Sequence, residues 1–386
     1  MNTTKLKNVC VVVSGTTPKS TDKRYWNGTH VWITPAELSE DSFIVTDSER
    51  HITDEAIKAT GLKSFPKGTV LLSSRAPIGK VAIAGCEMYC NQGFKNLICS
   101  ESIYNLYLYY FLKSKTAYLN SLGRGATFKE ISKGIVEDIS IPFPVYSEQI
   151  RIAKQLQKIS ELISLKKGQY RYFDDIIRSR FIEMFGDPND VSILSLPGEK
   201  KSIEDVCDGI YGGGTPSKSH KEYYTGKIPW VTPKDMKTLS IDDSQNHINS
   251  EAIENSTAKL IPKRCVLMVI RSGILKHTLP VAINNVEVTI NQDMKAFVPS
   301  SLITPGYLLY TFKLMEKSIL SKVRGVTADN IEFSEFRKRR IVVPPIEVQT
   351  QFVDFALSID KSKLAVQKSL DELETLKKSL MQTYFG

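Results

Sequence analysis

The fold is decided by two short stretches, Gly15-Thr16-Thr17-Pro18 and Trp32-Ile33-Thr34-Pro35, because both return later in the chain. The first returns as Gly213-Gly214-Thr215-Pro216 and the second as Trp230-Val231-Thr232-Pro233, each 198 residues further on. Repetition at a fixed period is the sequence signature of a duplicated structural unit. The chain is therefore expected to fold as two similar halves.

Further matching pairs follow in the same order, with a drift of only a few residues. They are His51-Ile52 with His247-Ile248, Glu55-Ala56-Ile57 with Glu251-Ala252-Ile253, Arg75 with Arg271, Asn91-Gln92 with Asn291-Gln292, Tyr107-Leu108 with Tyr307-Leu308, Arg124-Gly125 with Arg324-Gly325, and Phe185-Gly186 with Phe385-Gly386. Chance supplies single pairs but not an ordered series, so the duplication is expected to cover the whole chain.

Each copy divides into two parts of different character. The first part mixes short β-rich runs, such as Gly68 to Leu72 and Val81 to Ile83, with glycine and proline, and this pattern is typical of a mixed α+β domain. The second part contains no proline and repeats apolar residues in steps of four and three. That spacing predicts one long helix with a coiled-coil seam.

The two predicted seams are similar. The first consists of Ile152, Leu156, Ile159, Ile163, Tyr170, Phe173, Ile177 and Met184, interrupted by Lys166 and Arg180. The second consists of Phe352, Ala356, Ile359, Val366, Leu370, Leu373, Leu380 and Tyr384, interrupted by Lys363 and Lys377. Because the two seams share one heptad register, we expect the helices to pack on each other. The alternative, that each seam packs only on its own domain, stays open.

These patterns define a complete architecture. We expect an α+β fold of two tandem domains, residues 1–146 and 187–346, each followed by a long helix, residues 147–186 and 347–386. About 37 helical residues at about 1.5 Å each make a rod of about 55 Å. The two helices would form an antiparallel coiled-coil spacer with pseudo-two-fold symmetry.

Composition narrows the class of protein. The chain has 386 residues, 41% hydrophobic and 24% charged, and no apolar run reaches the roughly 18 residues of a membrane span. The apolar stretch Val9 to Val13 is too short for a signal-peptide core, so a cytoplasmic location is expected.

Six cysteines in so long a chain form no disulfide framework, and Cys10 and Cys207 occupy matching places that suit small buried residues. The formal net charge of +9 favours a polyanionic partner.

Four stretches together resemble the target-recognition pattern of one family, the specificity subunits of type I restriction-modification enzymes. They are Gly213-Gly214-Thr215-Pro216, Ile228-Pro229-Trp230-Val231-Thr232, Asn91-Gln92-Gly93-Phe94, and Ile141-Pro142 to Gln149. The resemblance covers nearly the whole chain, including both long helices and the proline-rich junctions that precede them. Copy two departs from the pattern at Asn291-Gln292-Asp293-Met294 and at Ala328-Asp329-Asn330, which replaces Phe128-Lys129-Glu130.

The resemblance implies a DNA-binding subunit without chemistry of its own. Each target-recognition domain would read one half of a bipartite, asymmetric double-stranded DNA target, and the helices would fix the gap between the halves. The implied partners are two adenine methyltransferase subunits and, in the full complex, restriction subunits that translocate DNA. S-adenosylmethionine, ATP and Mg²⁺ would be bound by those partners and not by this chain.

None of the stretches that resemble a catalytic motif contains all the residues that the motif requires. An adenine methyltransferase loop has an Asp or Asn before two prolines and an aromatic after them, whereas Val343-Pro344-Pro345-Ile346 has neither. The run Gly212-Gly213-Gly214 is interpreted as a turn, since no Gly-Lys-Ser/Thr follows as a phosphate loop requires. Two Asp-Met-Lys triplets, at 235–237 and 293–295, stand without further carboxylates. Cys86, Cys90 and Cys99 lack the second ligand pair of a zinc site.

DNA contact requires cations for phosphates, and arginines, amides or hydroxyls for base edges. The candidates lie in loop-like or glycine-flanked segments. In copy one they are Lys19, Lys23, Arg24, Arg75, Arg124, Thr127 and Lys129, and in copy two Lys218, Lys221, Lys234, Arg271, Lys276, Arg324 and Thr327. Trp32 and Trp230 are interpreted as core residues instead of base-stacking ones.

Three other functions remain open from the sequence. They are a methyltransferase-nuclease with unrecognised active sites, a purely structural coiled-coil adaptor, and the specificity subunit of a related type II system.

Overall fold

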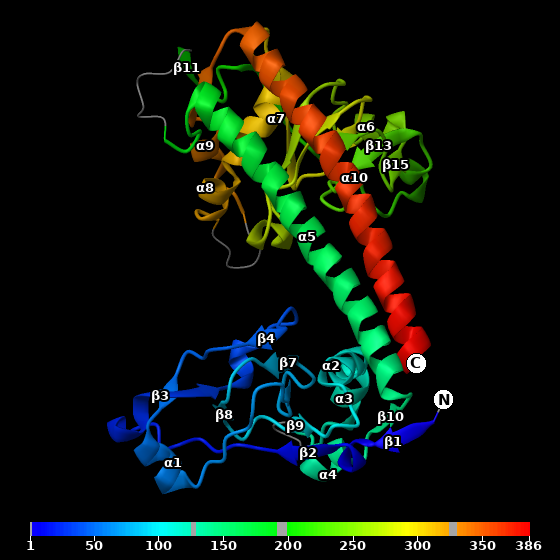
Figure 1. The fold of residues 1–386 in the computed structure, drawn as a ribbon. Coiled ribbons are helices and arrows are strands. Elements are labelled where there is room, and N and C mark those ends of the chain that lie inside the picture. Colours follow the sequence, from blue (N-terminus) through cyan, green and yellow to red (C-terminus); the bar gives the residue numbers. More distant parts are fainter. Residues whose placement is uncertain (1, 125–128, 191–198, 324–329) are drawn as a thin grey trace. The chain divides into compact units, whose positions relative to one another are not determined.

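The computed structural model describes residues 2–124, 129–190, 199–323 and 330–386 (Figure 1). The chain forms two compact units. Unit 1 contains Met1–Gly168 together with Gln367–Gly386, and unit 2 contains Gln169–Val366. Each unit therefore combines one globular domain with part of each long helix.

Short strands build the globular domain of unit 1. They are β1 (Thr3–Lys5), β2 (Cys10–Val13), β3 (Trp26–Ile33), β4 (Ile44–Val45), β5 (His51–Ile52), β6 (Val70–Leu72), β7 (Val81–Ala84), β8 (Tyr89–Cys90), β9 (Asn96–Cys99) and β10 (Ser140–Pro142). They form a five-stranded sheet in the order β2-β9-β6-β7-β4, a three-stranded sheet in the order β5-β3-β8, and the pair β1-β10.

The domain of unit 2 repeats this arrangement. Its strands are β11 (Glu199–Ser202), β12 (Cys207–Gly212), β13 (Ile228–Val231), β14 (Ser240–Ile241), β15 (His247–Ile248), β16 (Val266–Val269), β17 (Val281–Asn284), β18 (Thr289–Ile290), β19 (Met294–Pro299) and β20 (Arg340–Val343). Their sheet orders are β12-β19-β16-β17-β14, β15-β13-β18 and β11-β20. Position for position, these orders match those of unit 1, so the predicted duplication is confirmed.

Short helices complete both domains. Unit 1 contains α1 (Asp54–Thr60), α2 (Asn105–Ser114), α3 (Thr116–Leu122) and α4 (Lys133–Glu137), with 3₁₀ turns η1 (Leu6–Asn8), η2 (Lys23–Tyr25) and η3 (Pro35–Glu37). Unit 2 contains α6 (Ser250–Glu254), α7 (Pro305–Leu314), α8 (Glu316–Leu320) and α9 (Phe333–Phe336), with η4 (Lys221–Tyr224) and η5 (Gly273–Lys276). Helix α2 is buried from Leu106 through Leu112, as expected for a helix enclosed by its domain. The predicted α+β class is confirmed.

Two long helices follow the domains, α5 (Tyr146–Phe185) and α10 (Ile346–Phe385). A fully buried glutamine ties the start of each helix to its domain. Gln149 donates to the carbonyls of Ser102 and Pro144 and accepts from the amide of Tyr104. Gln349 makes the equivalent bonds in unit 2. These bonds explain why the stretch from Ile141 to Gln149 belongs to the repeated pattern.

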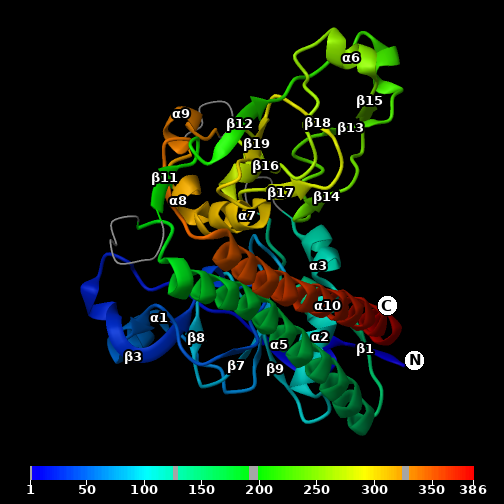
Figure 2. The ribbon, with the colours of Figure 1, turned by 90° about the horizontal axis from the view of Figure 1, so that it is seen from above.

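The long helices run side by side in opposite directions within each unit (Figures 1 and 2). In unit 1, Ile163 clusters with Leu370, and Tyr384 donates to Gln155 at 3.0 Å. In unit 2, Lys363 pairs with Asp174, while the rings of Phe181 and Phe352 lie 5.2 Å apart. Residue numbers rise along one helix as they fall along the other, so the predicted antiparallel pairing is confirmed.

The first seam residues of each helix also pack on the helix's own domain. Ile152 and Leu156 belong to the core of the first domain, and Phe352 and Ala356 to the core of the second. The alternative that each seam packs only on its own domain is nevertheless wrong, because Ile163 of one helix contacts Leu370 of the other.

Each long helix ends in the core of the unit that it reaches last. Phe385, at the end of α10, lies 5.2 Å from the ring of Tyr107 and 5.8 Å from that of Phe111 in unit 1. Phe185, at the end of α5, packs on the rings of Tyr307 and Phe352 in unit 2. The two copies therefore exchange their helix ends. This exchange explains why a Phe-Gly pair closes each copy.

Other sequence expectations also have structural outcomes. Trp32 and Trp230 are buried, which confirms that they are core residues. All six cysteines lie within the described residues and are free; Cys10 is buried, whereas Cys207 is half-buried. None of the helices in the described ranges is long and apolar enough to cross a membrane.

Candidate nucleic-acid interface

The repeated Gly-x-Thr-Pro loop owes its glycine to a close approach between backbones. A Cβ atom on Gly15 would lie 1.6 Å from the carbonyl oxygen of Cys90, and one on Gly213 would lie 2.1 Å from that of Ile290. Only glycine fits such a position. Gly213 thus packs against β18 and Gly214 against the backbone of Thr257 and Ala258, in line with the interpretation of the run Gly212-Gly213-Gly214 as structural backbone.

The loop and the Asn-Gln motif meet in both domains. The hydroxyl of Thr17 donates to the side-chain carbonyl of Gln92 at 2.6 Å, and Thr215 donates to Gln292 in the same way. The buried tryptophans also bind this loop: Trp32 donates from Nε1 to the carbonyl of Thr16, and Trp230 donates in the same way to the carbonyl of Gly214. Two sequence motifs therefore form one polar surface in each domain.

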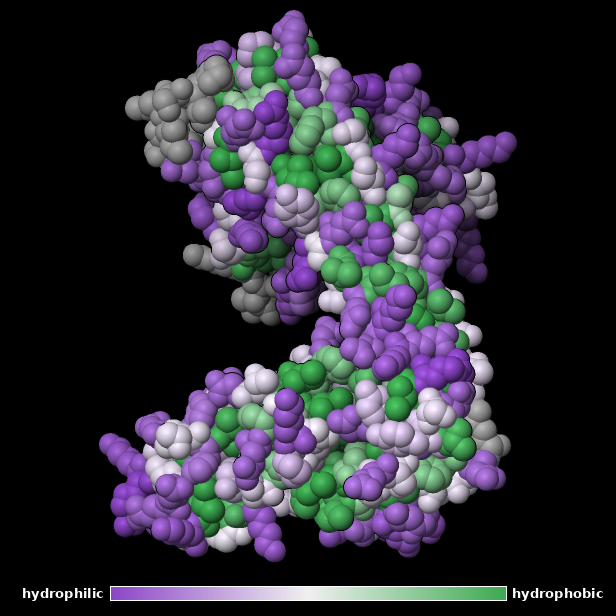
Figure 3. All heavy atoms as spheres, in the orientation of Figure 1, coloured by the Kyte–Doolittle hydropathy of each residue, from purple (hydrophilic) through white to green (hydrophobic). Residues whose placement is uncertain are grey.

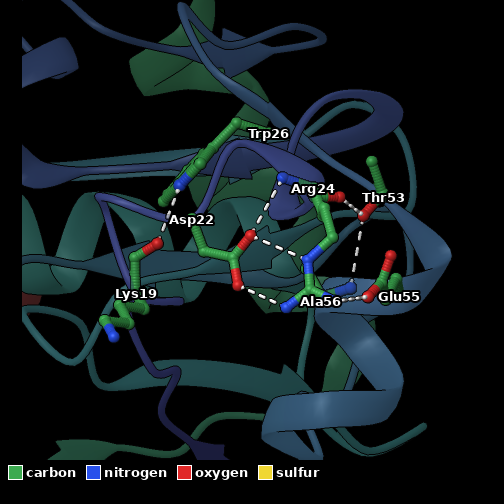
Figure 4. A network of polar contacts seen from close by, with 7 residues as sticks. All are labelled: Lys19, Asp22, Arg24, Trp26, Thr53, Glu55 and Ala56. Atoms are coloured by element: carbon green, nitrogen blue, oxygen red, sulfur yellow. Dashed lines mark hydrogen bonds and ion pairs between the residues drawn. The ribbon is translucent and has the colours of Figure 1, made fainter.

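The cationic side chains Lys19, Lys23 and Arg24 lie together on the first domain, and all three are exposed. Arg24 is held by carboxylates (Figure 4): its Nη2 lies 2.7 Å from Asp22, and its Nη1 lies 3.2 Å from Glu55. The hydrogen bond from Arg24 lowers the pKa of the Asp22 carboxyl below its ordinary value. Lys19 and Lys23 are therefore the better suited of the three to contact a phosphate.

The same end of unit 1 is hydrophilic at its surface. Figure 3 shows polar side chains gathered over the region of β3 and α1. In the same region, the guanidinium carbon of the exposed Arg50 lies 3.3 Å from the ring centroid of the buried Trp26, a cation–π geometry. No local sequence signal pointed to Arg50, because β3 and β5 bring it to the tryptophan.

A second group forms around Glu130 in the first domain. Arg75 donates from Nε to Glu130 at 2.9 Å, and the backbones of Arg124 and Glu130 exchange two hydrogen bonds. Lys129 is exposed beside them. The structure thus brings Arg75 close to Arg124 and Lys129, which lie much later in the sequence.

The candidate cations of the second domain lie on several different segments. Lys218, Lys221 and Lys234 are exposed, with Lys221 in η4 and Lys234 after Pro233. Arg271 is paired with Asp293, with Nη2 at 2.7 Å from the carboxylate. Lys276 is exposed at the end of η5. Three further candidates, Thr127, Arg324 and Thr327, lie outside the described residues.

Sequence reasoning missed the partners of the two arginines. Glu130, Lys95 and Asp293 were not among the predicted contact residues, although the departures of copy two from the pattern fell at 293 and 330. Those departures were the available signal, because they change the acid at both places.

The residues that resembled catalytic motifs have structural partners instead. Asp235 accepts hydrogen bonds from the backbone and hydroxyl of Thr232, both at 2.8 Å, and Asp293 pairs with Arg271. The carbonyl of Pro344 accepts from the buried Gln349 at the start of α10. No group of three His, Cys, Asp or Glu side chains that could hold a metal ion occurs within the described ranges.

Comparison with known proteins decides the family. The model of the type I restriction modification DNA specificity domain matches residues 1–171 and again residues 197–375. The chain belongs to this specificity family. One match falls in each copy, and each match includes the globular domain and part of the long helix that follows it.

Relatives of the specificity family match over most of the chain. The MjaIX specificity subunit of Methanocaldococcus jannaschii is 30% identical across 98% of this chain and 90% of its own length. The EcoR124I/EcoR124II specificity subunit of Escherichia coli is 30% identical across 66% of this chain and 63% of its own length. A crystal structure of the S subunit from M. genitalium superposes with a TM-score of 0.59 at 15% identity, covering 100% of this chain and 96% of that one. That likeness supports the fold.

Proposed function

We propose that the chain is the DNA-reading subunit of a type I restriction-modification enzyme and recognises a bipartite, asymmetric target with one half-site for each domain. One observation carries the proposal: two specificity domains share one sheet order but differ in the charged side chains on their loops. A shared scaffold with different loops suits the reading of two different half-sites. The paired helices would set the gap between them.

The chain supplies recognition and its partners supply chemistry. Methyltransferase subunits would bring S-adenosylmethionine and transfer its methyl group to adenine, and restriction subunits would bring the ATP- and Mg²⁺-dependent steps. The chain itself would bind none of these cofactors. Its net charge of +9 suits phosphate neutralisation, so affinity for DNA should fall steeply as salt rises.

The test is a map of N6-methyladenine in DNA from cells with and without this gene, and with residues 187–346 exchanged for those of a relative. Deletion should remove one bipartite motif, and the exchange should alter only one half of it. An unchanged map after deletion would contradict the proposal. A methyl-transfer assay on the purified chain tests the rival enzyme function, which predicts activity without partners.

A further inference from the structure

Arg75 and Arg271 occupy the same place in the two domains but take their acidic partners from different loops. Arg75 follows β6 and pairs with Glu130, whereas Arg271 follows β16 and pairs with Asp293. The place of Glu130 is taken in copy two by Asn330, and the place of Asp293 is taken in copy one by Gly93. The arginine is retained while its acid has moved.

The acid of the first domain is held firmly. Lys95, which is only 8% exposed, reaches one oxygen of Glu130 at 3.1 Å and the hydroxyl of Ser74 at 3.4 Å. The other oxygen of Glu130 accepts from Arg75. Burial alone would raise the pKa of the Glu130 carboxyl, but the hydrogen bonds from Arg75 and Lys95 lower it below its ordinary value. Glu130 is therefore a fixed anion with one oxygen aimed at the arginine.

The acid of the second domain is held by a different residue. Asn291 donates from its side chain to one oxygen of Asp293 at 3.0 Å, and the backbone amide of Asp293 donates back to Asn291 at 3.2 Å. The remaining oxygen faces Arg271. Each domain thus has an arginine, an acid that orients it and a residue that orients the acid.

The two arginines present different donors as a result. Glu130 engages Arg75 through Nε. Among the described residues, Nη1 and Nη2 of Arg75 have no protein partner. Asp293 engages Arg271 through both Nε and Nη2, which leaves both hydrogens of Nη1 and the second hydrogen of Nη2. The side chains of Arg75 and Arg271 are 44% and 48% exposed, so the remaining donors are accessible.

Stability alone is a weak reason for this construction. Exposed ion pairs contribute little to stability, whereas burying a lysine requires a dedicated partner. The buried Lys95 acts mainly on the orientation of the guanidinium. It fixes the carboxylate of Glu130, and that carboxylate in turn orients Arg75.

We propose that Arg75 and Arg271 each read a base edge in the half-site of their own domain, and that Glu130 and Asp293 are positioning residues that set how each guanidinium is presented. The inference rests on the proposed function. Arg75, with two terminal nitrogens to offer, fits O6 and N7 of a guanine in the major groove. Arg271 offers both hydrogens of Nη1 and the second hydrogen of Nη2, so it also presents a fork, which Asp293 holds through two nitrogens. Because the acid sets the direction of each fork, it contributes to base preference together with the arginine.

The test uses the chain assembled with its methyltransferase subunits and a DNA library that carries every single-base change of the target. Arg75→Lys keeps the charge but loses the fork, so it should lower discrimination at one G·C pair of one half-site by about 10-fold or more. Glu130→Gln should lower discrimination at that same pair, and Glu130→Asp should restore part of it. Asp293→Asn should act at one pair of the other half-site. Matched controls are Glu101→Gln and Asp208→Asn, which change exposed carboxylates and should leave every position unchanged.

The outcomes separate this inference from the proposed function. A uniform loss of methylation over the whole library, with no pair singled out, would identify Arg75 and Arg271 as phosphate contacts and overturn the inference, while the bipartite requirement would persist. If Arg75→Lys yields no methylation at all, Glu130→Gln decides alone, and an unchanged base preference in that variant overturns the inference. A wild-type complex without any bipartite preference would instead remove the proposed function itself.

Discussion

The helix pair is built differently in the two units. In unit 1, Ile163 and Leu370 are buried against each other, 8% and 7% exposed. In unit 2, the positions 200 residues away in the repeat hold Lys363 and Tyr170, and the amine of Lys363 lies 4.3 Å from the ring centroid of the tyrosine. The same heptad contact is therefore apolar in one unit and charged in the other.

The ion pair beside this contact is also more exposed in unit 1 than in unit 2. Glu374 in unit 1 pairs with Lys167, and both side chains are 48% exposed. Asp174 in unit 2 pairs with Lys363, whose side chain is only 14% exposed. An apolar contact stabilises through burial and tolerates sliding, whereas a polar seam residue fixes the register at some cost in stability. Unit 2 thus fixes how the two helices are aligned, and unit 1 adds burial.

The largest expected effect concerns what the units share, the exchanged helix ends. Phe185→Ala and Phe385→Ala each remove a ring that is 2% exposed, so each should cost about 3–5 kcal/mol of unfolding free energy. Hydrogen exchange locates the damage: Phe385→Ala should speed exchange in α2 and spare α7, and Phe185→Ala should do the reverse.

Two exposed leucines on the same helices provide the controls. Leu165 is 69% exposed and Leu364 is 71% exposed, so their alanine variants should change the unfolding free energy by less than about 0.5 kcal/mol. If Phe385→Ala proved as mild as Leu364→Ala, the helix end would not belong to the core of unit 1.

These helix ends also show where sequence reasoning stops. The seams are local patterns, so the long helices and their antiparallel pairing could be predicted from spacing. Phe181 is buried although it lies outside the predicted seam, and its ring packs on Tyr307 of α7. Where Phe185 and Phe385 dock depends on residues far away in the chain. No spacing rule carries that information.

The candidate site shows the same division. The motif positions Thr17, Gln92 and Arg75 could be found because the repeat marks them. Lys95 and Glu130 could not be paired from sequence, since isolated backbone bridges outside the named strands bring their segments together across 35 residues. The mixed strand directions, such as β4 running parallel to β7, were likewise beyond the reach of local propensity.

A smaller effect should distinguish the two acids. Asp174→Ala leaves the nearly buried Lys363 without its carboxylate and should cost about 1.5–3 kcal/mol. Glu374→Ala breaks a half-exposed pair and should cost at most about 1 kcal/mol. Denaturant unfolding of both variants measures the difference, with Asp175→Ala, an exposed neighbour, as control. An equal cost for the two acids would remove the contrast between the units.

The smallest effect comes from making unit 2 resemble unit 1. Lys363→Ile combined with Tyr170→Leu replaces the charged contact by an apolar one of the kind seen at Ile163. Because a paired charge in a partly buried place is often matched by good apolar packing, the unfolding free energy should change by about 1 kcal/mol or less. Its dependence on salt should weaken. A large loss would show that the ion pair is a principal source of stability.

The exchanged helix ends also affect the order in which the two domains can complete folding during synthesis. The core of unit 1 includes Phe385, so the core of the domain that the ribosome completes first stays incomplete until the final turn of α10 has been made. Synthesis proceeds at about 5–20 residues per second. The roughly 200 residues of unit 2 therefore take about 10–40 s to synthesise, and the core of unit 1 lacks Phe385 during that time. Unit 2 receives Phe185 from a helix synthesised before its own domain and meets no such delay. The second domain can therefore finish folding before the first.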